Sequence, residues 1–262
     1  MPEVAPIVTV FGGSGFIGRY ICQRLAREGW RVRVAVRRPN DAVFVRTYGV
    51  VGQVEPIQAN VRDEASVRRA MHGVDAVINC VGILVTSGRQ TFDAVQAEAP
   101  GRIARIAAEL GIRRLVQISA IGADPESDSE YARTKAAGEH AVLAAFPNAV
   151  ILRPSIVFGV EDRFFNRFAS MASYMPVLPI VAPDTRFQPV YVEDVAKAAV
   201  KAVSEPMEPG VYELGGPEVC TFRELMERML HVIGRRRPVI TVPFGLARIQ
   251  AKVLDFLQRV SF

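Results

Sequence analysis

Two short patterns in this 262-residue sequence contain residues whose types and spacing suit nucleotide binding and proton transfer. The first is a glycine-rich stretch between an apolar run and a helical pattern. Gly13, Gly15 and Gly18 fit the spacing G-x-G-x-x-G, and Gly12 with the last two fits G-x-x-G-x-x-G. Such glycines allow a tight turn, close approach of the backbone to a pyrophosphate, and close packing of helix on strand. The stretch predicts dinucleotide binding, and the alternative is an ordinary tight turn. The residues assigned to this loop are Gly12, Gly13, Ser14, Gly15, Phe16, Ile17 and Gly18.

The second pattern pairs Tyr131 with Lys135, four residues further along the chain. On a helix this spacing places both side chains on one face. A tyrosine with a pKa of ~10 is a poor base at neutral pH, but a nearby ammonium group favours the phenolate and lowers that pKa. The pair is therefore a candidate for proton transfer, and the alternative is an exposed tyrosine–lysine pair on a helix surface.

Two arginines, Arg37 and Arg38, stand at the end of the second predicted strand, about 20 residues beyond the glycines. An NAD-binding protein usually places an acid there for the ribose hydroxyls, but this sequence has no acid before Asp41. Guanidinium groups suit a 2′-phosphate because their N–H groups match its oxygens in pairs. The pattern predicts NADP(H) in preference to NAD(H), and the alternative is a solvated basic strand end.

The stretch after the third predicted strand adds three candidate cofactor residues. Asn60 and Val61 are assigned to the cofactor site. Asp63 is a candidate for the adenine edge or, equally, for the N-cap of the following helix.

Short apolar runs alternate with longer helical patterns over the first 154 residues, and these elements would position both patterns. The predicted strands are 7–11, 31–36, 54–58, 75–80, 114–119 and 149–152, and the predicted helices are 16–28, 65–71, 92–110 and 130–146. Alternation of this kind is typical of an α/β protein with a parallel sheet wrapped by helices. After Pro154 prolines become frequent, and two helices stand out, 192–204 and one opened by the capping-box spacing of Thr221 and Glu224. We expect a dinucleotide-binding domain over 1–154 and a smaller C-terminal lobe over 155–262 that is integrated with it.

The composition argues against several classes of protein. With 32 Lys+Arg against 27 Asp+Glu the net charge is +5, and no aromatic residues interleave with the one dense basic cluster, Arg235–Arg237. A nucleic-acid partner is therefore not expected. Three distant cysteines argue against a disulfide scaffold, and three histidines show no metal-ligand spacing. The longest uncharged stretch, 168–183, is 16 residues long and contains three prolines, short of the ~20 residues of a membrane-spanning helix. We expect a cytoplasmic chain without a transmembrane segment.

The glycine stretch, Asn79–Gly82 and Tyr131–Lys135 together resemble an extended or atypical short-chain dehydrogenase/reductase. Further stretches are similar to the branch of that superfamily that contains the nucleotide-binding accessory subunit of respiratory complex I and its bacterial relatives. These stretches are Val81-Gly82-Ile83-Leu84, Ser119-Ala120-Ile121-Gly122-Ala123-Asp124, residues 152–159 and residues 187–192. The resemblance covers nearly the whole chain and implies a Rossmann-type doubly wound sheet with a small C-terminal lobe.

The resemblance also implies roles for individual residues. Lys135 would hold the nicotinamide ribose hydroxyls. Other residues would border the cofactor: Cys80, Val81, Gly82, Ser119, Pro154, Ser155 and Ile156. The family places a serine or threonine after the fifth strand to orient the substrate carbonyl, and here that position is Ser119 or Ala120, depending on register. An alanine has no hydroxyl, which favours cofactor binding over turnover.

Two hypotheses for the function follow. In the first, NADP(H) is bound structurally, and the protein is an accessory or assembly component linked to respiratory complex I or to quinone-biosynthesis proteins. In the second, Tyr131, Lys135 and Ser119 act in an NADP-dependent oxidoreductase or epimerase for a small molecule. The amphipathic segment 244–260 is either a surface helix on its own core or a docking helix for a partner or for the inner face of the plasma membrane.

Overall fold

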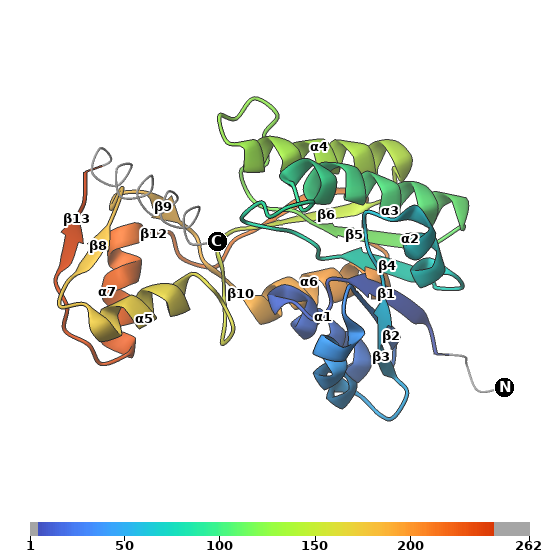
Figure 1. The fold of residues 1–262 in the computed structure, drawn as a ribbon, viewed down its shortest axis with the longest axis horizontal. Helices are drawn as coiled ribbons and strands as arrows, with labels where there is room; N and C mark the ends of the chain where they lie inside the picture. The colour runs from blue at the N-terminus through green and yellow to red at the C-terminus, as the bar shows by residue number, and fades with distance from the viewer. Residues whose placement is uncertain (1–4, 244–262) are drawn as a thin grey trace. The chain divides into compact units, whose positions relative to one another are not determined.

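The computed structural model describes residues 5–243 and confirms the α/β fold that the sequence predicts. Seven strands of this described part form one parallel sheet in the order β11-β6-β5-β4-β1-β2-β3 (Figure 1). These strands are β1 (Ile7–Phe11), β2 (Arg31–Val36), β3 (Val54–Gln58), β4 (Ala76–Asn79), β5 (Arg114–Ile118), β6 (Val150–Pro154) and β11 (Gly210–Leu214). Strand order runs outward from β1 in one direction and from β4 in the other, so the sheet is doubly wound.

Helices cover both faces of this sheet (Figure 1). They are α1 (Phe16–Arg27), α2 (Glu64–Met71), α3 (Glu98–Glu109), α4 (Glu130–Ala145) and α6 (Val192–Ser204). The same part of the chain contains a 3-10 helix, η1 (Pro39–Tyr48), a π-helix, η2 (Asp93–Ala97), and a short strand, β10 (Val190–Tyr191). Helix α1 ends at Arg27 with Glu28 as its C-cap, and the following Gly29 has a φ of +85°, the left-handed conformation that commonly closes a helix. None of the helices in residues 5–243 combines the length and the hydropathy needed to cross a membrane.

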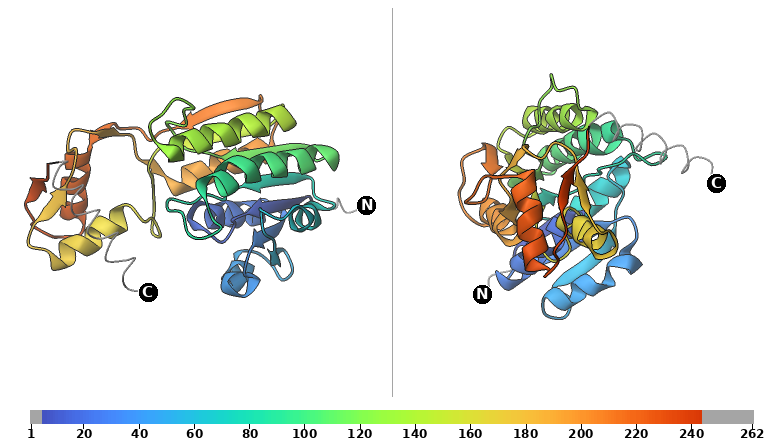
Figure 2. Two further views of the ribbon diagram at one scale, coloured as in Figure 1. Left: turned by 45° about the horizontal axis from the view of Figure 1, so that its top comes forward. Right: turned by 90° about the vertical axis from the view of Figure 1, so that its left-hand side faces the viewer.

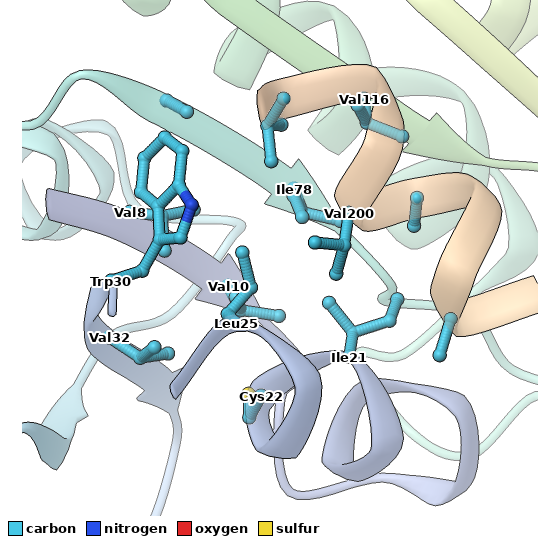
Figure 3. Close-up of a cluster of buried hydrophobic side chains, with 14 of the residues drawn as sticks. Val8, Val10, Ile21, Cys22, Leu25, Trp30, Val32, Ile78, Val116 and Val200 are labelled. Atoms are coloured by element: carbon cyan, nitrogen blue, oxygen red, sulfur yellow. The ribbon is translucent and has the colours of Figure 1, made fainter. Parts of the chain in front are cut away.

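Two apolar clusters hold the helices to the sheet. One lies under α1 and α6, where Ile21 and Leu25 of α1 and Val200 of α6 pack on Val10 and Ile78 of the sheet (Figure 3). The other lies under α2, α3 and α4 on the opposite face. The interior strands β1, β2, β4 and β5 contribute side chains to both clusters, as the period-2 geometry of a strand requires. The carboxyl ends of the strands are thereby fixed relative to the helices that begin beside them.

The helix expected over 92–110 forms over residues 92–109, but its first turns are not regular α-helix. Residues 93–97 form the π-helix η2, and α3 begins only at Glu98. Pro100 has no N–H to donate to the carbonyl of Gln96, so the regular ladder is interrupted there. The freed carbonyl faces α4, where a Cβ on Gly138 would lie 2.0 Å from it. Only a glycine at position 138 permits this approach of α4 to η2.

The described residues divide into two compact units. The sheet unit contains residues 5–155 and 190–215, and the small unit contains residues 156–189 and 216–243. The sequence-based division at residue 154 assigns 190–215 to the C-terminal lobe, whereas in the structure β10, α6 and β11 belong to the sheet unit. The amphipathic segment 244–260, predicted to be either a surface helix or a docking helix, lies outside the described residues.

The small unit has its own core, built on two helices that pack against each other (Figure 2). Its elements are β7 (Val157–Phe158), α5 (Phe165–Tyr174), β8 (Leu178–Ile180), β9 (Arg186–Phe187), β12 (Cys220–Thr221), α7 (Phe222–Val232) and β13 (Val239–Thr241). Met226 and Leu230 of α7 pack with Leu178 of β8, and the predicted capping box of Thr221 and Glu224 starts α7.

Candidate dinucleotide and reaction site

The glycine stretch forms the turn that joins β1 to α1. Gly12 has a φ of +73°, which favours glycine, and its amide donates to the carbonyl oxygen of Ala35 at 3.0 Å. A Cβ on Gly18 would lie 2.4 Å from the Gly12 oxygen, so only glycine lets α1 pack this closely on the turn. No side chain caps the N-terminus of α1 at Gly15. The first N–H groups of α1 therefore remain available for an anion.

The turn lies where the strand order of the sheet reverses, between β1 and β4. A Cβ on Gly12 would lie 3.3 Å from the carbonyl carbon of Cys80 and from Cγ2 of Val81, so the two strand ends touch. Open parallel sheets bind ligands in the crevice at such a reversal. A cavity of about 670 Å³ lies here, within the sheet unit, in the size range of cofactor sites.

The lining of this cavity brings together ten of the predicted cofactor residues. They are Gly12, Ser14, Gly15, Arg37, Arg38, Asn60, Val61, Cys80, Val81 and Gly82. Sequence reasoning missed eight others, Ala35, Val36, Asp41, Ala59, Arg62, Ile83, Gln90 and Val95. Most of these flank the predicted residues at the ends of β2, β3 and β4. The rule that ligands meet the carboxyl ends of parallel strands could have identified these flanking residues from the predicted strands alone.

Three guanidinium groups line the cavity. Arg38 pairs with Asp41 at 3.9 Å, but both side chains are largely exposed, so the pair holds Arg38 weakly. Within residues 5–243, Arg37 is exposed and has no side-chain hydrogen bond or ion pair. Arg62 donates from Nη1 to the carbonyl oxygen of Arg89 at 2.7 Å. Arg37 is thus the guanidinium of this group most available to a phosphate.

The other predicted cofactor residues lie outside the lining. Asp63 caps α2, because its carboxylate accepts from the amide of Ala65 at 3.2 Å. The Ser155 amide donates to the carbonyl oxygen of Leu214, and Ile156 begins the small unit. The remaining residues are Gly13, Phe16, Ile17 and Gly18 of the turn and α1, Pro154 at the end of β6, and Ser119, Tyr131 and Lys135.

Tyr131 and Lys135 lie on one face of α4, as their spacing predicts. Lys135 is only 7% exposed, and its Nζ lies 5.8 Å from the centre of the Tyr131 ring. Burial lowers the pKa of Lys135 to about 8, although the nearby Glu139 and Cys80 favour its charged form. Burial raises the pKa of Tyr131, whose ring also packs edge-on against Phe92 at 6.0 Å. The tyrosine in this structure is therefore a weaker acid than a free one.

The hydroxyl of Ser119 is not free to orient a substrate carbonyl. It donates a short hydrogen bond to the carboxylate of Glu139, and both side chains are about 5% exposed. Arg153 binds the same carboxylate with Nε at 3.0 Å and Nη2 at 2.7 Å. Of the two candidate positions, Ser119 is thus tied to a buried ion pair, and Ala120 has no hydroxyl. Long-range partners of this kind leave no signal in the local sequence.

Cys80 lines the cavity as a neutral thiol. Burial raises its pKa to about 12, and the charge of Lys135 offsets only part of that rise. Because the thiolate is the nucleophile, Cys80 is inert in this state and serves as a small packed residue.

The side-chain amide of Gln96, a buried residue of η2, lies beside Gly82, as does the ammonium group of Lys135. A Cβ on Gly82 would lie 3.4 Å from Nζ of Lys135 and 3.7 Å from Oε1 of Gln96. Nε2 of Gln96 donates to the hydroxyl of Thr134, whereas its Oε1 has no partner within residues 5–243. An unpaired buried oxygen beside a buried ammonium fits a ligand that carries hydroxyl groups.

A family model described as "NAD dependent epimerase/dehydratase family" matches residues 8–215. The chain belongs to this family. The match extends over the glycine turn, the cavity and the Tyr131–Lys135 face, and ends at the last residue of the sheet unit. Membership in the epimerase/dehydratase family supports a nicotinamide dinucleotide as the ligand of the cavity.

Relatives of this epimerase/dehydratase chain include respiratory subunits and a reductase. It is 38% identical to the mitochondrial NADH dehydrogenase (ubiquinone) 1 alpha subcomplex subunit 9 of Arabidopsis thaliana, over 96% of this chain and 64% of the relative. It is 31% identical to the ceramide reductase of Caulobacter vibrioides, over 90% of this chain and 74% of the relative. The chain covers 54–64% of the length of the Arabidopsis, Dictyostelium discoideum and mouse subunits.

A solved structure shares the fold. The UDP-glucose 4-epimerase of Thermus thermophilus, in complex with NAD, superposes with a TM-score of 0.73 and is 25% identical. The superposition covers 90% of this chain and 86% of the epimerase. The doubly wound architecture of the sheet unit is therefore that of nicotinamide-dependent epimerases.

Proposed function

We propose that this protein binds NADP(H) as a structural cofactor and acts as an accessory or assembly component of a quinone-linked respiratory complex of the complex I type. The observation that carries this proposal is the hydrogen bond of Ser119 to Glu139. It removes the hydroxyl that would orient a substrate carbonyl, while the nucleotide cavity keeps its glycine turn and its arginines. The named respiratory relatives support the partner class.

The residues of the sheet unit fit an NADP(H) molecule. The open N-terminus of α1 would hold the pyrophosphate, and Arg37 with Arg38 would hold the 2′-phosphate. Lys135 would donate to the nicotinamide ribose hydroxyls, and Oε1 of Gln96 would accept from one of them, which satisfies both buried groups. When bound, the nicotinamide can exchange a hydride with a substrate. In a structural role that chemistry is unused, and the cofactor joins the ends of β1, β2 and β4.

A second candidate function is an NADP-dependent oxidoreductase or epimerase for a small molecule. The common face of Tyr131 and Lys135 favours it, as does the identity with the Caulobacter reductase. In such an enzyme Tyr131 would transfer the proton, and binding energy would have to compensate for the missing orienting hydroxyl.

The test is affinity purification of the tagged protein from its own host, with the co-purified proteins quantified. We expect subunits of a membrane-bound NADH:quinone oxidoreductase, at the inner face of the plasma membrane in a bacterial host. Gly15→Val and Lys135→Ala should reduce the assembled complex, whereas Tyr131→Phe should leave it unchanged. Recovery of quinone-biosynthesis enzymes instead would reassign the partner.

The enzyme alternative has its own measurement. Purified protein would be assayed for NADPH oxidation with quinones and with carbonyl substrates. Sustained turnover that disappears in Tyr131→Phe would reject the structural proposal in favour of the reductase.

A further inference from the structure

The basic cluster Arg235–Arg237 has no part in the nucleotide site, because it belongs to the small unit. It follows the C-terminus of α7, where the Gly234 amide donates to the carbonyl oxygen of His231 and the Arg235 amide donates to that of Leu230. Gly234 has a φ of +66°. The chain thus turns sharply after α7 and presents the arginines at the end of that helix.

The end of α5 lies beside this turn. Nε of Arg237 donates to the carbonyl oxygen of Ala172 at 3.1 Å, and the amide of Leu178 donates to the carbonyl oxygen of Pro238. Strands β8 and β13 then continue in parallel, with Leu178 opposite Val239. Residues 174–177 and 232–237 therefore run next to each other at one end of the small unit. Figure 1 shows α5 and α7 of this unit approaching the same end.

Four apolar side chains at this end are exposed in the described part of the chain. Tyr174 is 87% exposed and Val232 is 82% exposed, and Met175 and Ile233 are each 37% exposed. Buried neighbours such as Ala172 and Leu230 keep the helices in place. We call these four residues together with Arg235 and Arg236 the α5/α7 tip.

The two segments that form the α5/α7 tip carry positive charges and no negative ones. Neither residues 163–183 nor residues 228–243 contain an aspartate or glutamate, and the preceding acid on α7 is Glu227, one turn before His231. Arg235 and Arg236 are exposed, and neither side chain forms a hydrogen bond or ion pair with residues 5–243. Both are therefore available to an anionic partner.

We propose that the α5/α7 tip docks on an anionic phospholipid surface. Arginines near such a surface are attracted by its negative potential, and tyrosine with aliphatic side chains favours the boundary between headgroups and acyl chains. A nucleic acid would pair with the arginines but would leave Val232, Ile233 and Met175 in water. The combination of exposed aliphatic groups with unpaired guanidinium groups fits a lipid surface better.

The test is flotation of the full-length protein with vesicles of phosphatidylcholine alone or of an equal mixture with phosphatidylglycerol. We expect binding to the mixed vesicles only, and weaker binding at high salt. Arg235→Gln/Arg236→Gln should reduce the partition coefficient about 25-fold, because each arginine near the surface contributes about fivefold. Tyr174→Gln/Val232→Gln should also weaken binding by removing the inserted groups.

The matched control is Arg27→Gln/Lys197→Gln, which removes the same charge from exposed positions on α1 and α6 of the sheet unit. It should bind the mixed vesicles as the unmodified protein does, and all variants should keep their affinity for NADPH. Equal binding of both vesicle types, or an equal loss in the control, would overturn the proposal. Vesicle binding that survives both tip variants would assign the membrane contact to residues 244–262 instead. Absence of vesicle binding, with co-purification of a protein partner that is lost in Arg235→Gln/Arg236→Gln, would show an acidic protein surface as the occupant.

Discussion

The phosphate end and the reaction end of the candidate site differ in how their polar groups are used. At the phosphate end, the N–H groups of α1 and the guanidinium of Arg37 have no internal partners among residues 5–243. At the reaction end, Ser119 is bound to Glu139, and Tyr131 is partly buried against Phe92. Groups that bind an anion are left free, whereas the Ser119 hydroxyl that would orient a substrate carbonyl is bound to Glu139. This difference is the basis of the proposal that the site retains a nucleotide without turnover.

The largest expected effect concerns the phosphate end. Gly15→Val should weaken NADPH binding by at least about 100-fold, because a branched side chain would cover the backbone N–H groups that face the pyrophosphate. The fold should survive, since a Cβ on Gly15 would meet only the Gly12 oxygen at 3.2 Å. Calorimetric titration gives the affinity, and thermal denaturation gives the stability.

Gly18→Val is the contrasting variant for the same turn. Its Cβ would lie 2.4 Å from the Gly12 oxygen and 2.7 Å from Cα of Gly13. This overpacking should destabilise the fold by about 3 kcal/mol. If Gly15→Val were folded and kept full affinity for NADPH, the open N-terminus of α1 would not be the phosphate site.

The next largest effect is expected at the reaction end, for a substitution of Lys135. Burial lowers the pKa of Lys135 from 10.5 to about 8, so folding is penalised while the lysine is charged. At 1.36 kcal/mol per pKa unit, Lys135→Met should raise the free energy of unfolding at pH 7 by up to roughly 3 kcal/mol. The same variant should bind NADPH more weakly, since the ribose loses its donor.

The pH dependence gives the matching readout. Between pH 8 and 10.5 the unfolded chain holds the Lys135 proton and the folded chain has released it, so stability of the unmodified protein should rise across this window. Urea denaturation at several pH values should show this rise, and Lys135→Met should lack it. Equal slopes in both proteins would mean that Lys135 is hydrated in solution.

A smaller effect concerns the choice of cofactor. Arg37→Glu should reduce the preference for NADPH over NADH by about tenfold, because an exposed guanidinium–phosphate bond contributes near the lower limit of charge-assisted bonds. Arg31→Glu, at the other end of β2, removes an exposed arginine away from the cavity and should leave the preference unchanged. Equal affinity of the unmodified protein for NADH and NADPH would contradict the assignment of Arg37.

The smallest effect is expected for Tyr131→Phe. In a site for retention, the phenol does no proton transfer, so the affinity for NADPH should stay within about twofold, well inside the range of a single hydrogen bond. Equilibrium titration checks this. A large loss of affinity would show that the Tyr131 hydroxyl contacts the nucleotide. The reaction end would then bind the nucleotide with its polar groups, as the phosphate end does.

The interior strands β1 and β2 could be predicted residue by residue. The sequence places strands at 7–11 and 31–36, and these are the bounds of β1 and β2. Short apolar β-branched runs between turn signals leave little choice of structure. By contrast, β11 at the edge of the sheet was not predicted, because Gly210–Leu214 alternates between half-buried and exposed side chains and includes Glu213.

The site could be predicted only where chemistry follows from local spacing. The glycine turn and the Tyr131–Lys135 face depend on residues a few positions apart, and both occur as expected. The Ser119–Glu139–Arg153 cluster joins β5, α4 and β6, so it depends on the packing of distant elements. The position of Gln96 depends on the interruption of the helix before Pro100, which helical periodicity does not reveal.

The last strand of the sheet, β11, is synthesised long after its neighbour β6, and this delay affects how the protein folds during synthesis. Strand β6 ends at Pro154, but its edge partner β11 is completed only at Leu214, after the first segment of the small unit. A ribosome needs roughly 3–12 s for the intervening 60 residues. During that interval the nascent sheet exposes the backbone groups of an apolar strand, which is a template for pairing with other chains. A holding chaperone should therefore increase the yield of folded protein, because it covers β6 until β11 has been synthesised.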